Sequence, residues 1–97
     1  MPWYSCHLES RPALETTIQN RFETIFKAAG GPSEMLLVCQ SHHPRVSTLW
    51  LRLPDEKYRS AFPEFNEADE GKLPKKAMLL IGDNAEFERL FKYGRED

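Results

Sequence analysis

The side chains with metal-binding chemistry gather in one short stretch, Cys39-Gln40-Ser41-His42-His43. Thiolate and imidazole are common zinc ligands, and a structural zinc site uses four of them. This stretch offers three at most. The nearest further candidates, Cys6 and His7, belong to a strand that we expect two strand spacings away, about 10 Å. We therefore predict no bound metal, and we predict that Cys6 and Cys39 are buried free thiols rather than a disulfide.

Motifs that bind nucleotides or activate nucleophiles are absent, since the sequence has no P-loop, no G-x-G-x-x-G, no G-x-S-x-G and no H-E-x-x-H. We therefore predict no cofactor. Pro2 has catalytic potential through its position, because removal of the initiator methionine would make it an N-terminal secondary amine. In this residue and the β-α unit that follows it, the chain resembles the tautomerase superfamily, whose enzymes use such a proline as a general base. The resemblance implies a weaker alternative function, a small tautomerase-like enzyme.

Four segments have the apolar patterns of strands. Residues 3–9 and 46–53 alternate apolar and polar side chains, which is typical of half-buried strands. Residues 35–40 and 77–81 are apolar on both faces, which indicates covered strands. The short polar connection at 41–45 predicts a hairpin between the second and third strands.

Helices are predicted between these strands and after the last one. Apolar residues recur at three- and four-residue intervals from Leu14 to Ala29, which predicts a helix that Ser10 caps and Gly30-Gly31-Pro32 ends. Residues 55–62 have the spacing of two helical turns. A last helix is predicted after Asp83 as its cap, with Glu86 at the capping-box position. Its apolar side chains are Phe87, Leu90 and Phe91.

The predicted order, β-α-β-β-short α-β-α, is that of a ferredoxin-like split βαβ arrangement with an added C-terminal helix. We therefore predict an α+β fold, a single domain over residues 1–97, with an antiparallel sheet in which 77–81 is the fourth strand of an order 4-1-3-2. Residues 63–76 are predicted to be a long polar loop. The predicted core consists of Leu14, Ile18, Phe22, Phe26, Leu49, Leu51 and Leu53.

One face of this sheet carries residue types that are common in binding sites. The alternation of the first and third strands places Trp3 and His7 on the face away from the core, beside Trp50 and Arg52. Tryptophan and arginine are enriched at binding hot spots. Since a large apolar face is rarely left open, we expect the last helix, a second subunit or a ligand to cover it. We predict that Trp3, His7, Trp50 and Arg52 bind a ligand or partner.

Composition narrows the function classes. The 97 residues have a formal net charge of −2, which does not favour nucleic acid as a partner. The N-terminus lacks a secretory signal and no apolar stretch could span a membrane, so we expect a cytoplasmic protein. Our leading hypothesis is a small binding or regulatory module, a homodimer or the partner of another protein. The alternatives are a dimeric α+β barrel enzyme with His7 as acid or base, and an RNA-binding sheet.

Overall fold

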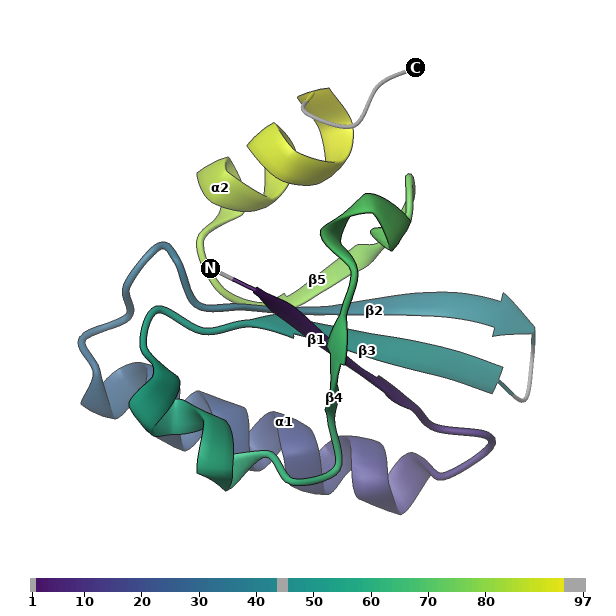
Figure 1. Ribbon diagram of the computed structural model, residues 1–97, viewed down its shortest axis with the longest axis horizontal. Helices are drawn as coiled ribbons and strands as arrows, with labels where there is room; N and C mark the ends of the chain where they lie inside the picture. The colour runs from purple at the N-terminus through teal and green to yellow at the C-terminus, as the bar shows by residue number, and fades with distance from the viewer. Residues whose placement is uncertain (1, 44–45, 94–97) are drawn as a thin grey trace.

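The computed structural model describes residues 2–43 and 46–93, with the backbone alone at 42, 43, 92 and 93. It is an α+β fold built on one antiparallel sheet of five strands (Figure 1). In chain order, its elements are β1 (Trp3–His7), α1 (Pro12–Ala28), β2 (Leu36–His43), β3 (Val46–Arg52), the 3-10 helix η1 (Glu56–Ala61), β4 (Asn66–Ala68), the 3-10 helix η2 (Glu70–Lys72), β5 (Met78–Ile81), α2 (Asn84–Glu88) and the π-helical turn η3 (Arg89–Tyr93).

The strands lie in the order β4-β1-β3-β2-β5. The hairpin of β2 and β3 and the pairing of β1 with β3 agree with the prediction. The predicted place of the strand at 77–81 is wrong, because β5 pairs with β2 and the position beside β1 is taken by β4. In the three-stranded arrangement β1-β3-β2, the edges formed by β1 and by β2 can each accept an apolar strand. The hydrophobic pattern of 77–81 therefore does not indicate which edge the strand pairs with.

Helix α1 covers one face of the sheet, which we call the first face (Figure 1). Ile18 and Phe22 are its fully buried side chains, while Leu14 and Phe26 are only partly buried at the rim. The core on this face is otherwise made by alternate residues of the strands and their immediate flanks, and by two aromatic residues that follow η1. These are Tyr4, Cys6, Leu8, Met35, Leu37, Cys39, Leu49, Leu51, Leu53, Phe62 and Phe65.

The predicted N-terminal cap of α1 is wrong, whereas its predicted C-terminal end is confirmed. Ser10 is not the cap; it adopts φ 67° in the turn before the helix, and Arg11 stands at the N-cap without a side-chain hydrogen bond. Pro12 occupies the first turn, where its missing N–H costs nothing. The C-terminal prediction is confirmed. Gly30 and Gly31 both have positive φ, and the Gly31 N–H donates to the Phe26 carbonyl at 2.8 Å.

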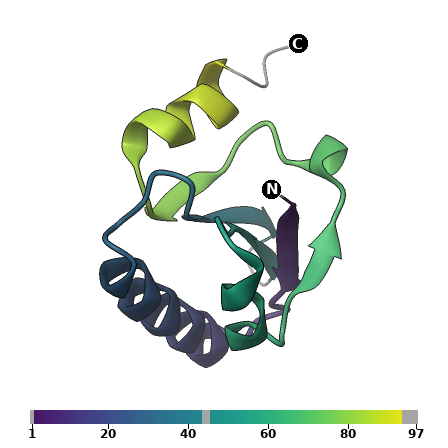
Figure 2. The same ribbon diagram turned by 60° about the vertical axis from the view of Figure 1, so that its left-hand side comes forward.

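The segment predicted as a long loop contains β4 and η2 instead. β4 and β5 lie at opposite edges of the sheet, so the chain between them has to cross it. It crosses the face opposite α1, as Figure 2 shows, and Leu73 is buried there. The turn before β4 is fastened by Arg59, whose guanidinium donates to the carbonyls of Phe62 at 2.7 Å and Phe65 at 2.6 Å.

The chain then turns from β5 into α2. Gly82 has φ 141°, and a Cβ at this position would lie 2.6 Å from a methyl group of Leu36, so the turn needs glycine. Asp83 caps α2 as predicted, and its carboxylate accepts from the backbone N–H groups of Ala85 and Glu86. Helix α2 and η3 lie over the sheet on the side opposite α1 (Figure 1). No helix in residues 2–43 or 46–93 combines the length and the apolarity that a bilayer crossing requires.

Candidate functional site beneath the C-terminal helix

The candidate site lies on the sheet face opposite α1, which we call the second face. The antiparallel register of β1 and β3 pairs Trp3 with Arg52, Ser5 with Trp50, and His7 with Thr48. Because alternate residues of a strand point to the same face, these pairs form two adjacent rows. The structure therefore places the four predicted site residues on one face and brings Trp3 and Arg52 together, with Trp50 in the same buried cluster as Trp3 and with His7 at the far end of the rows.

The second face is closed by the chain itself, the first of the three covers that we considered. We call residues 84–93, which form α2 and η3, the C-terminal cover. Its Phe87 and Phe91 rings stack with centroids 5.0 Å apart, and Phe91 meets Trp3 edge-on at 5.9 Å. Trp3 is 1% exposed and Trp50 is 7% exposed. The remaining buried members of this second core are Leu36, Val38 and Leu73.

A charged cluster fixes the cover to the sheet. Arg52 of β3 donates to Glu86 of α2 at 2.6 Å, and Arg89 donates to the same carboxylate at 2.6 and 3.0 Å. The Arg52 guanidinium also lies 5.7 Å from the centre of the Trp3 ring and donates to the Glu34 carbonyl. Hydrogen bonds from Arg89 and Arg52 lower the pKa of Glu86 from 4.5 to about 2. The carboxylate of Glu86 is therefore ionised at neutral pH and held at two points.

The indole of Trp50 is buried with an unsatisfied hydrogen-bond donor. Its Nε1–H is buried and has no hydrogen-bond partner, the one such side-chain atom among the described residues. An unpaired buried donor costs about 1–3 kcal/mol relative to a paired one. The register places Ser5 on one side of Trp50 and Val38 on the other. The second core thus buries this ring without supplying an acceptor.

His7 lies at the other end of the two rows, and its exposure differs from that of Trp3 and Trp50. Its side chain is exposed, and its Nδ1 lies 3.0 Å from the hydroxyl oxygen of the buried Thr48. The second face therefore runs from a sealed aromatic end at Trp3 to an open polar end at His7.

The cysteines belong to the first face, away from this site. Both pair in register with Leu49, Cys6 from β1 and Cys39 from β2, so they lie two strand spacings apart, about 9.5 Å. A disulfide needs Cα atoms within about 7 Å. The prediction of two buried free thiols is confirmed, and burial raises the pKa of both. Among the residues that the structure describes, no three His, Cys, Asp or Glu side chains converge as a metal site would require. The side chains of His42 and His43 are outside that description.

Three residues of this site were not predicted as site residues. Glu86 was predicted only as a residue of the helix start. It directly precedes Phe87, so it flanks the side of the helix that carries Phe87 and Phe91. Leu73 lay in an expected loop, and only the crossing of the sheet brings it here. Glu34 contributes through its backbone carbonyl, for which the sequence carries no signal.

Comparison with known proteins gives no match: no family model, no curated protein and no solved structure is similar to this chain.

Proposed function

We propose that this protein is a small binding module that recognises a partner protein through the second face of its sheet. The C-terminal cover is then an internal occupant that the partner displaces. The observation that carries the proposal is that Trp3, Trp50 and Arg52, residue types typical of hot spots, lie on one face to which a short terminal segment is attached through Phe91 and Glu86.

The short length of the cover supports the proposal that a partner can displace it from the second face. Helix α2 has five residues and η3 has five more, and isolated helices of that length are marginal in water. Its attachment therefore depends on its contacts with the second face, chiefly Phe87, Phe91 and the pair of Glu86 with Arg52. A segment held in this way can open without unfolding the α1 side of the sheet.

The cover also indicates what kind of partner fits. It presents aromatic side chains four residues apart, with a carboxylate directly before the first. We propose that the partner offers an amphipathic helix with this pattern, which docks its apolar side on the sheet. A partner that also brings an acceptor to the Trp50 indole N–H would gain a hydrogen bond that the cover lacks. Every copy of this chain carries such a helix, so exchange of covers between two copies is the homodimeric form of the same proposal.

We further propose that the fold is a ferredoxin-like variant. The order β4-β1-β3-β2 is that of a split βαβ unit, with η1 where the second long helix would lie and β5 added at the β2 edge. Two free buried thiols favour a cytoplasmic location.

Native-state hydrogen exchange tests displaceability directly. We expect amides of 84–93 to exchange through openings at least about 2 kcal/mol below those of the β2–β3 hairpin. Equal opening free energies would contradict the proposal, because the cover would then be an integral part of the fold.

A peptide with the sequence of residues 83–93, blocked at both ends, tests recognition. The variant Phe91→Ala weakens the internal occupant, so we expect it to bind the peptide about tenfold more tightly than the unmodified protein does. Phe26→Ala is the matched control on the first face and should leave peptide affinity unchanged. Failure of Phe91→Ala to bind the peptide while it remains folded would contradict the proposed recognition mode. Sedimentation of the unmodified protein would show whether exchange between copies occurs.

A further inference from the structure

The outer edge of β2 is only half covered. β2 has eight residues, whereas β5 has four, and their ladder ends where Cys39 pairs with Met78. In the described part of the chain, no strand pairs with that edge from Gln40 onward. An uncovered edge presents N–H and C=O groups that can pair with another extended segment. Because β2 is already held by β3 on its other side, this edge is rigidly presented.

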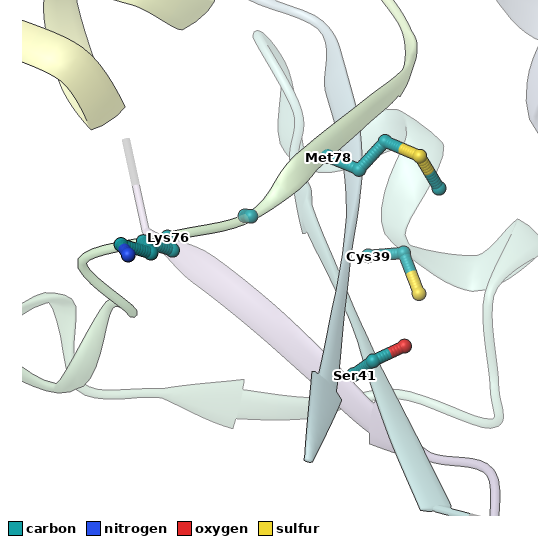
Figure 3. A pocket seen from close by; sticks show the side chains of 5 residues that line it. Cys39, Ser41, Lys76 and Met78 are labelled. Atoms are coloured by element: carbon teal, nitrogen blue, oxygen red, sulfur yellow. The ribbon is translucent and has the colours of Figure 1, made fainter. Parts of the chain in front are cut away.

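A hollow of about 290 Å³ lies beside this edge, lined by Cys39, Ser41, Lys76, Ala77 and Met78. Figure 3 shows the Cys39, Ser41 and Met78 side chains on one side of the sheet, at the point where the chain before β5 diverges from β2. Met78 is 61% exposed, the one large hydrophobic side chain that is exposed in the described residues. A strand laid along the edge would direct every second side chain into this hollow.

The direction of β5 determines which end of an added strand arrives here. β5 runs antiparallel to β2 and begins at Met78. An added strand that is likewise antiparallel to β2 has its N-terminal residues beside His43. Its C-terminal residue then lies beside Gln40, next to the start of β5. Lys75 and Lys76 lie there with exposed side chains, and Lys76 forms no ion pair within the described residues. Positive charge at that point complements a carboxylate.

We propose that the uncovered edge of β2 binds the C-terminal end of an extended peptide by β-strand addition. The peptide backbone pairs with β2 from Gln40 onward, one apolar side chain enters the hollow beside Met78, and the terminal carboxylate lies near Lys76. The hollow is at the sheet edge on the α1 side, with Lys76 across β2 from Cys39, Ser41 and Met78 (Figure 3), so the site is separate from the aromatic cluster of the second face and does not depend on the function proposed for that face.

An NMR titration of the ¹⁵N-labelled full chain tests this proposal. The probe is acetyl-Thr-Val-Thr-Val-Thr-Leu with a free carboxylate, added to about 2 mM, a concentration that detects weak binding. We expect amide shifts at 39–41 and 76–78. We expect the same peptide ending in an amide to bind about fivefold more weakly, the size of one exposed charge pair.

Two variants separate the parts of the site. Lys76→Glu should weaken binding of the free-acid peptide by about fivefold or more, while Lys57→Glu, the same change at an exposed residue of η1, should not. Met78→Gln should weaken both peptides, since it removes the apolar wall of the hollow. The proposal is overturned by an absence of shifts at these residues, by equal binding of acid and amide, by shifts confined to the second face, or by sedimentation showing that two copies pair through this edge.

Discussion

Replacing Glu86 with glutamine should loosen the C-terminal cover while leaving the first face intact. Glu86 receives hydrogen bonds from both Arg52 and Arg89, and these hold its pKa near 2 instead of 4.5. A difference of that size would correspond to about 3 kcal/mol at about 1.4 kcal/mol per pKa unit. Since Arg89 is 63% exposed and water screens its charge, we expect Glu86→Gln to cost about 1–2 kcal/mol at pH 7.

The pH dependence provides the stronger test. A carboxylate whose folded-state pKa is lowered stabilises the protein at pH values above its unfolded pKa. For Glu86 this contribution is complete above about pH 4.5 and is lost as the pH falls toward 2. The free energies of unfolding of the unmodified protein and of Glu86→Gln should therefore converge over that range. Glu23→Gln is the control, because its pair with Lys27 is exposed and 3.6 Å long and should contribute less than about 0.5 kcal/mol.

Intrinsic fluorescence is a suitable assay, because both tryptophans of the chain, Trp3 and Trp50, belong to the buried cluster that contains Phe87 and Phe91 of the cover. Urea titrations followed by fluorescence, at several pH values between 2 and 7, should show the loss at pH 7 and its disappearance near pH 2. A stability difference that is constant across this range would refute the assignment of Glu86 as the charged anchor. A Glu86 pKa near 4.5, measured by NMR, would refute it as well.

Three further substitutions test the packing, each by denaturant titration. Phe22→Ala should cost about 3–5 kcal/mol, because Phe22 is a fully buried side chain of α1 that packs against Phe62; a loss below about 1 kcal/mol would contradict the core assignment. Arg59→Ala should cost about 2 kcal/mol, since it leaves two carbonyls without their charged donor, whereas an unchanged midpoint would show that the turn before β4 does not depend on it. Trp50→Phe should cost less than about 1.5 kcal/mol, because the indole N–H makes no hydrogen bond that could be lost. A larger loss would mean that the N–H is paired in solution.

Local patterns in the sequence predicted the faces of the strands. The alternation along 3–9 and 46–53 assigns Trp3 and Trp50 to one face and Tyr4 and Leu49 to the other, as the two cores show. The end of α1 and the cap of α2 were predictable because Gly30, Gly31 and Asp83 act within a few residues of their own positions. These features depend on period and on local hydrogen bonds, which a single sequence displays.

Features that depend on distant partners were not predictable in the same way. β4 consists of Asn66, Glu67 and Ala68, which have no apolar alternation, and it exists through backbone pairing with β1. The position of β5 follows from the crossing of the second face by the chain around Leu73, not from the apolar residues of β5. The pairing of Arg52 with Glu86 likewise arises only after α2 is seated on the sheet.

The strand order also has a consequence for the time course of folding. β2 and β3 are neighbours in sequence and in the sheet, whereas β1 reaches β3, and β5 reaches β2, from distant parts of the chain. Local contacts form first, so the hairpin with α1 is the natural nucleus and the remaining pairings set the rate. The residues of the cover are synthesised after all five strands. A chain whose cover has not yet docked closes the second face of its sheet only with the crossing segment around Leu73. At that stage it is most exposed to aggregation and to capture by chaperones.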